Sequence, residues 1–133
     1  MKEVVYNNSI VSVTEQNSES NHEKKIIILE APNWVNIIPI TKNNEVVFVR
    51  QFRHGISSET LEIPGGMIDP GESPLNAAKR ELAEETGYTS DQWICLGVSE
   101  PNPAIQSNLC HMFLALDAEL THKRDLDPNE VIN

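Results

Sequence analysis

Three glutamates, Glu81, Glu84 and Glu85, are spaced three and four residues apart, which places them on one side of a helix within a single turn. Like charges at these spacings repel each other by roughly 0.2–0.5 kcal/mol per pair on an exposed helix. Such a cluster is tolerated where the helix face is fully solvated, and it is stabilised where a cation lies between the carboxylates. The helix alone leaves both interpretations open.

The segment that precedes the helix favours the cation. We expect Pro64-Gly65-Gly66 to turn tightly and to present bare backbone carbonyls, and carbonyl and carboxylate oxygens are the ligands of a hard divalent ion. Glu72 adds a carboxylate where the helix begins. Arg80 can reach Glu84 one turn later or fold back toward Glu72, so it could hold a metal-binding carboxylate in position.

The helix is delimited by local signals. Ser73 is a good N-cap, Pro74 suits the first helical position, and Gly87 supplies the C-terminal stop. An apolar face is expected from Leu75, Ala78 and Leu82. The remaining chain is β-prone and predicts strands over 4–6, 10–14, 25–30, 34–40, 45–52, 60–63, 93–98 and 109–116, with polar connections at 15–24 and 99–108. This pattern predicts an α+β domain dominated by mixed or antiparallel sheet.

Composition narrows the class of protein. The 133-residue chain has the size of one domain, and its net charge of −10 argues against a nucleic-acid-binding protein, because phosphate backbones are bound by clustered Lys and Arg. The sequence has no secretory h-region and no apolar run near the ~20 residues that span a bilayer, so we expect a soluble cytoplasmic protein with no membrane partner.

Cys95 and Cys110 are too few for a disulfide framework and are expected in the core. The zinc motif of nucleobase deaminases and the G-x-S-x-G motif of serine hydrolases are absent.

The order of glycine, acid, arginine and acid cluster resembles a known motif, the Nudix box. In this chain the motif reads Gly66-x5-Glu72-x7-Arg80-Glu81-Leu82-x-Glu84-Glu85-x-Gly87-Tyr88. All seven fixed positions match, and only the final position differs, where Tyr88 replaces a bulky aliphatic residue at a packing site. Residues 49–53 and 61–69 are similar to the ADP-ribose pyrophosphatase branch of the family, and a looser similarity extends over residues 30–117.

The resemblance implies a Nudix-type α/β/α sandwich with a mixed sheet, in which a loop–helix–loop holds Mg²⁺ or Mn²⁺ against a diphosphate. Glu81, Glu84 and Glu85 would be metal ligands and catalytic residues, with the Gly65 carbonyl as a fourth ligand. The expected reaction is hydrolysis of a nucleoside diphosphate linked to another group, foremost ADP-ribose to AMP and ribose 5-phosphate. The alternatives are a nucleoside triphosphate pyrophosphohydrolase and a non-catalytic Nudix-fold binding module.

The same resemblance assigns roles outside the helix. Arg53 would bind the diphosphate, although a surface arginine on a strand would look the same in sequence. Glu62 would accept a hydrogen bond from the substrate or pair with a residue of the neighbouring strand. Asn102 lies in the segment that corresponds to a substrate-contacting loop. Glu130 matches a loop carboxylate that supplies the catalytic base or an extra metal ligand.

The chain divides into a β-strand region over residues 1–40 and a Nudix domain over residues 41–133. The first region resembles an N-terminal antiparallel sheet extension that helps to form a homodimer, and its strands have too few neighbours to bury both faces. In the family a further strand and a long helix follow the loop at Glu130, so we expect the C-terminal helix of the sandwich to be missing. An uncovered sheet face would then expose apolar side chains and favour self-association or low stability.

Overall fold

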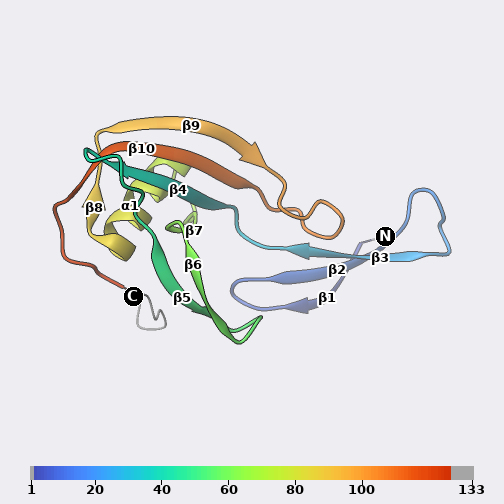
Figure 1. The fold of residues 1–133 in the computed structure, drawn as a ribbon. Helices are drawn as coiled ribbons and strands as arrows, with labels where there is room; N and C mark the ends of the chain where they lie inside the picture. Colours follow the sequence, from blue (N-terminus) through green and yellow to red (C-terminus); the bar gives the residue numbers. More distant parts are fainter. Residues whose placement is uncertain (1, 127–133) are drawn as a thin grey trace.

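An antiparallel sheet forms the N-terminal part of the fold. The computed structural model describes residues 2–126, and its first three strands pair in the order β1-β2-β3. They are β1 (Glu3–Asn7), β2 (Ser12–Asn17) and β3 (Lys25–Glu30), and they lie to one side of the remaining strands (Figure 1). The predicted N-terminal sheet is confirmed. However, β2 extends into residues expected in a polar connection, because Glu15 and Asn17 complete the ladder opposite Ile27 and Lys25.

A mixed sheet forms the centre of the molecule. Its strands are β4 (Trp34–Thr41), β7 (Gly65–Met67), β8 (Tyr88–Thr89), β9 (Gln92–Ser99) and β10 (Cys110–Leu120). The order is β7-β4-β10-β8, and β9 also pairs with β10. Only the β10–β4 pairing is parallel among these strands of residues 2–126, so the sheet is mixed, as predicted. Because β4 pairs inside this sheet, the expected division at residue 40 cuts through it, and the change of sheet falls between Glu30 and Trp34.

A separate hairpin extends from the mixed sheet. It consists of β5 (Val49–Arg53) and β6 (Ser58–Glu62), which pair antiparallel with each other (Figure 1). The single strand predicted over 45–52 is therefore shorter than expected. Val46 forms only an isolated bridge to Ile40, across a turn that contains Asn44 with a φ of 61°. After this turn the chain leaves the mixed sheet, and β5 finds its partner in β6.

The helix α1 (Pro74–Thr86) begins and ends as predicted. The Ser73 hydroxyl accepts a hydrogen bond from the Asn76 N–H at 3.3 Å, and Pro74 occupies the first turn. Gly87 closes the helix with a φ of 76°, and its N–H donates to the Ala83 carbonyl at 2.9 Å. A left-handed conformation suits glycine, because any other residue would strain the backbone there. No helix among residues 2–126 is long and apolar enough to cross a membrane.

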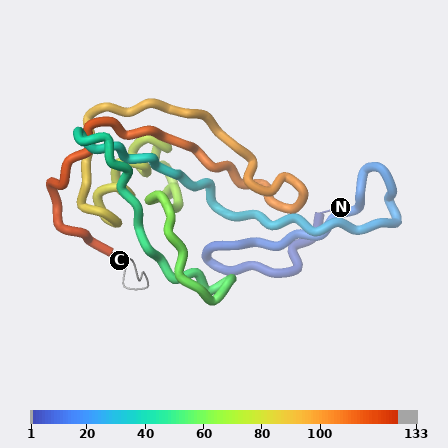
Figure 2. The backbone as a smooth tube through the Cα atoms, in the orientation of Figure 1, coloured from blue at the N-terminus to red at the C-terminus, as the bar shows by residue number. Residues whose placement is uncertain are grey.

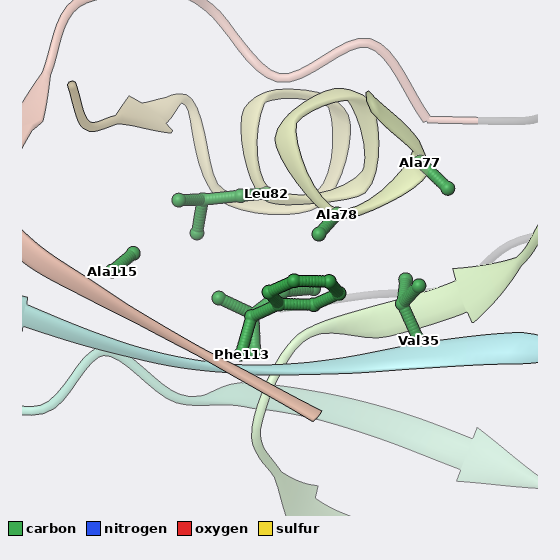
Figure 3. Packing of buried hydrophobic residues seen from close by; sticks show 7 residues of the cluster. Val35, Ala77, Ala78, Leu82, Phe113 and Ala115 are labelled. Carbon is green, nitrogen blue, oxygen red and sulfur yellow. The ribbon is translucent and has the colours of Figure 1, made fainter. Parts of the chain in front are cut away.

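The core lies between α1 and one face of the mixed sheet. Figure 3 shows the helix side chains pointing toward the strand side chains. The buried cluster is Val35, Ile37, Ala77, Ala78, Leu82, Phe113 and Ala115. Two expectations differ from this core: Leu75, in the first helical turn, is 36% exposed, and Cys95 is exposed on β9 whereas Cys110 is buried. The buried helix face instead includes Glu81 and Glu85, one and two turns after Ala77.

Candidate active site

The two glycines before the helix lie in a strand and not in a tight turn. In β7, Gly65 pairs with Asn36 and Gly66 pairs with Val35, and neither glycine has a positive φ. The prediction of a tight turn at these glycines is therefore wrong. Glycine is required there because other groups approach closely: an added Cβ would lie 2.2 Å from the Val35 carbonyl oxygen at Gly65, and 2.3 Å from the Glu81 carboxylate at Gly66.

Arg80 gathers the carboxylates of the helix and of the loop before it. Its Nη1 donates to Glu81 Oε1 at 2.8 Å and to Glu84 Oε2 at 3.0 Å. Its Nε and Nη2 donate to the two Glu72 oxygens at 3.1 and 3.0 Å, and Nη2 also donates to the Met67 carbonyl at 2.9 Å. The two contacts that the sequence offered as alternatives therefore occur together. These bonds, with Glu72 first, raise the pKa of Arg80, and they lower the pKa of Glu72.

Burial decides how the glutamate cluster is to be interpreted. Glu81 is 8% exposed and Glu85 is 2% exposed, so the face is not a solvated one. Glu85 Oε2 accepts a hydrogen bond from the Gly65 N–H at 2.9 Å, which joins α1 to β7. Only Glu84 of the trio is partly exposed. Buried carboxylates persist where hydrogen bonds or cations compensate for lost hydration, and Arg80 already supplies one such cation to Glu81.

The carboxylate oxygens of Glu81 and Glu84 suit a hard divalent ion as ligands. Glu81 and Glu84 both lie within hydrogen-bond distance of one Arg80 nitrogen, so their oxygens converge on a position of positive charge. Within residues 2–126, no three His, Cys, Asp or Glu side chains are grouped closely enough to hold a metal ion by themselves. That finding is compatible with Mg²⁺, which is commonly bound by one or two carboxylates, with water and substrate phosphates as the other ligands. The residues present therefore fit such an ion.

A cleft of about 670 Å³ lies over this cluster. Its walls include Arg53, Gly66, Arg80, Glu81, Glu84 and Asp125. Asp125 was not expected there. Its N–H donates to the Glu84 carbonyl at 3.0 Å, which brings the chain after β10 back to the helix. No local pattern around Asp125 signals this contact, because it joins residues that are distant in sequence.

Arg53 and Glu62 form a bidentate ion pair across the β5–β6 hairpin. Arg53 Nε donates to Glu62 Oε1 at 2.8 Å, and Nη2 donates to Oε2 at 2.7 Å. The hydrogen bond from Arg53 lowers the pKa of Glu62 to about 2. Of the two roles that the sequence left open for Glu62, the structure thus shows pairing with a residue of the neighbouring strand. Arg53 lines the cleft above the carboxylates.

Among the described residues that were predicted for the site, Glu62, Glu85 and Asn102 do not line this cleft. Asn102 is exposed, and its carbonyl accepts hydrogen bonds from the Ile105 and Gln106 N–H groups at 3.1 and 2.8 Å. It does not line the cleft over the carboxylates, so its contact with a substrate stays a prediction. Glu130 lies outside the described residues, and its role likewise stays a prediction.

A model of the family described as the NUDIX domain matches residues 32–133. The chain belongs to the Nudix family. An ADP-ribose pyrophosphatase of Bacillus subtilis is 31% identical over 134 residues, which cover 98% of this chain and 72% of that protein. An ADP-sugar pyrophosphatase of Mus musculus is 45% identical over 75 residues, which cover 53% of this chain but only 32% of the mouse protein. The predicted family and the prediction of an enzyme, a Nudix hydrolase, are confirmed.

A solved structure supports the Nudix fold. The crystal structure of an ADP compounds hydrolase superposes with a TM-score of 0.78 and 24% identity, covering 99% of this chain and 75% of that chain. At that identity the likeness concerns the fold alone. Enzymes of the Nudix family generally use a divalent metal ion, and the converging oxygens of Glu81 and Glu84 suit one.

Proposed function

We propose that this Nudix hydrolase cleaves the diphosphate linkage of ADP-ribose and releases AMP and ribose 5-phosphate, with Mg²⁺ or Mn²⁺ as cofactor. The observation that carries the proposal is the shared cleft, in which the Arg53 guanidinium and the convergent Glu81 and Glu84 carboxylates line one space. A guanidinium binds phosphate oxygens directly, whereas the carboxylates bind them through a cation. The names of the relatives, an ADP-ribose and an ADP-sugar pyrophosphatase, support a substrate whose diphosphate belongs to an ADP group.

Hydrolysis of the linkage adds one water molecule across the P–O–P bridge. The water oxygen forms a bond to one phosphorus, the bridging oxygen leaves with the other phosphorus, and one proton of the water is released. A bound divalent ion would polarise the phosphoryl oxygens and lower the pKa of the attacking water. Glu81, Glu84 and Glu85, with the Gly65 carbonyl, are the proposed ligands, and Arg80 keeps Glu81 and Glu84 oriented.

A substrate panel tests the proposal. ADP-ribose, NADH, an ADP-sugar and nucleoside triphosphates are incubated separately with Mg²⁺ and with Mn²⁺, and the products are separated. We expect AMP and ribose 5-phosphate from ADP-ribose, at the highest kcat/KM of the set. A nucleoside monophosphate and pyrophosphate from a triphosphate, formed with higher kcat/KM, would identify the alternative triphosphate pyrophosphohydrolase. Binding without any product would identify a non-catalytic module.

We further predict a two-fold homodimer formed through the N-terminal sheet. Val4 and Tyr6 on β1 are 60% and 56% exposed, and Ile27 on β3 is also exposed, so this sheet presents apolar side chains that a second subunit would cover. Sedimentation equilibrium at micromolar concentration should report a dimer. Val4→Lys should shift the protein toward monomer, whereas Glu23→Lys, in the exposed β2–β3 connection, should not. A wild-type protein that sediments only as a monomer contradicts the prediction.

Glu130 remains the predicted catalytic base. General-base catalysis typically contributes about 10²- to 10⁴-fold to a rate, so Glu130→Gln should lower kcat within that range and leave KM nearly unchanged. Glu23→Gln, which removes a charge from an exposed connection, serves as the matched control. The measurement is a pH profile of kcat for each variant. Turnover equal to that of the control at every pH would eliminate Glu130 as the base.

A further inference from the structure

A second cavity of about 350 Å³ adjoins the catalytic cleft. The two spaces share Arg53, Gly65, Gly66 and Met67 as walls, so one opens beside the other. A diphosphate held near Arg53 would therefore have one of its two substituents directed into this second cavity. The volume lies at the lower end of the ~300–1,000 Å³ typical of small-molecule sites, which suits one end of a nucleotide better than a whole one.

Trp34 and Asn36 of β4 line this second cavity together. Residues two apart on a strand face the same side, about 7 Å apart along it. Trp34 pairs with Met67 and Asn36 pairs with Gly65, so the tryptophan lies directly beside the glycine strand that borders the carboxylates. Trp34 is only partly buried. Trp34 thus contributes to the surface of a cavity that lies next to the carboxylate cleft.

The chemistry of the walls selects a flat, uncharged ligand group. Among residues 2–126, the charged residues that line the cavity are Arg53 and Glu62, and these two pair with each other. The other walls are apolar, as at Ile63, or carry carboxamides, as at Asn36 and Gln106. A nucleobase has this character, because its faces are apolar and its edge carries hydrogen-bond donors and acceptors that carboxamides can satisfy. A further phosphate would find no second basic side chain among the described residues of these walls.

The 101–108 segment, which contributes Pro101, Gln106 and Asn108 to the cavity wall, is held in place by the protein itself. The 101–108 segment lies along the end of β3, as the tube in Figure 2 shows. The Leu29 N–H donates to the Ile105 carbonyl at 2.7 Å, and the Ser107 N–H donates to the Leu29 carbonyl at 3.2 Å. The Asn108 amide donates to the Pro32 carbonyl at 3.1 Å. The N-terminal sheet therefore preforms this wall, so a ligand would not have to order it.

We infer that this cavity binds the nucleobase of the substrate, with Trp34 stacking on the base and the Asn36 and Gln106 carboxamides contacting its edge. The inference rests on the proposed function in one respect, since it requires that the substrate of the adjoining cleft is a nucleotide. It goes further by naming which cavity receives which end of the molecule. The terminal ribose then lies on the opposite side of Arg53, toward Asp125.

Binding of the two products separates the base end from the sugar end. Titration calorimetry with AMP and with ribose 5-phosphate is performed on wild type, Trp34→Ala and Trp34→Phe. Stacking of a base on an aromatic side chain predicts a loss of about 5- to 150-fold in AMP affinity for Trp34→Ala. We expect an unchanged affinity for ribose 5-phosphate, and recovery of most AMP binding in Trp34→Phe. A loss confined to ribose 5-phosphate, an equal loss for both products, or no loss would each overturn the inference.

Tryptophan fluorescence gives a readout that does not depend on turnover. The chain has two tryptophans, and Trp93 packs edge-on against Phe113 and donates to the Ser90 carbonyl at 2.8 Å, which anchors it in the core. AMP should quench the emission of wild type and of Trp93→Phe, but not that of Trp34→Phe. If Trp34→Ala fails to fold, Gln106→Ala tests the same cavity and should change the preference for AMP over IMP. An unchanged preference counts against the inference.

The inference and the proposed function can fail separately. If AMP quenches the fluorescence of Trp34 but the protein does not hydrolyse ADP-ribose, the nucleobase cavity is supported and the proposed substrate is refuted. Hydrolysis of ADP-ribose without any Trp34-dependent AMP signal would retain the function and place the base elsewhere.

Discussion

Glu84→Gln should lower kcat by several orders of magnitude and leave the fold intact. The substitution keeps the size of the side chain but removes the charge that converges with Glu81 on one position. Loss of one ligand charge weakens both cation binding and neutralisation of the transition state. Glu84 is partly exposed, so its replacement leaves no buried group unpaired. Steady-state kinetics with ADP-ribose, together with a Mn²⁺ titration by electron paramagnetic resonance, measures both effects.

Glu85→Gln should have a comparable effect on kcat for the same reason. An amide oxygen can still accept the hydrogen bond from the Gly65 N–H, so the link between α1 and β7 survives. Glu45→Gln, at an exposed position, is the control and should retain wild-type kinetics and Mn²⁺ affinity. Near-wild-type turnover in the Glu84 or Glu85 variant would refute their assignment as metal ligands.

Gly66→Ala should inactivate the enzyme while costing little stability, whereas Gly65→Ala should clearly destabilise the fold. At Gly66 the added methyl group meets the carboxylate of Glu81 at 2.3 Å, the mobile end of a long side chain. The end of the Glu81 side chain can move away more readily than a backbone segment, but its oxygens then no longer converge with Glu84. At Gly65 the methyl group meets the Val35 carbonyl oxygen at 2.2 Å, which belongs to the backbone of β4. The strand itself must shift, at a cost of about 1–3 kcal/mol.

Urea unfolding and kcat/KM, measured on both variants, provide the comparison. We expect Gly66→Ala to unfold close to the wild-type midpoint with kcat/KM lowered as far as in Glu81→Gln. Gly65→Ala should unfold at a clearly lower urea concentration. The matched control is Gly55→Ala, because a Cβ at Gly55 has no neighbour within 4 Å. A Gly66→Ala enzyme with normal turnover would show that the Glu81 position is not needed for catalysis.

Local sequence signals determined the helix that carries the chemistry. Ser73, Pro74 and Gly87 set the bounds of α1, because capping and left-handed termination depend only on neighbouring residues. The spacing of Glu81, Glu84 and Glu85 placed them on one side of the helix, because helical periodicity is a property of the chain itself. The box motif was sufficient to predict the family, and β-prone runs together with the family resemblance were sufficient to predict the N-terminal antiparallel sheet.

Only the tertiary structure decided what those residues touch. Glu81 and Glu85 are buried rather than solvated because β7 lies against α1, a contact between segments that no local pattern encodes. The same packing shows why Gly66 is a glycine, since its missing side chain leaves room for Glu81. In the sequence Trp34 looks like an ordinary strand residue, and it lines a cavity because β7 and the 101–108 segment come to lie around it. Contacts between distant segments depend on how the sheets assemble as a whole, so the sequence pattern predicts the elements while the assembled fold defines the site.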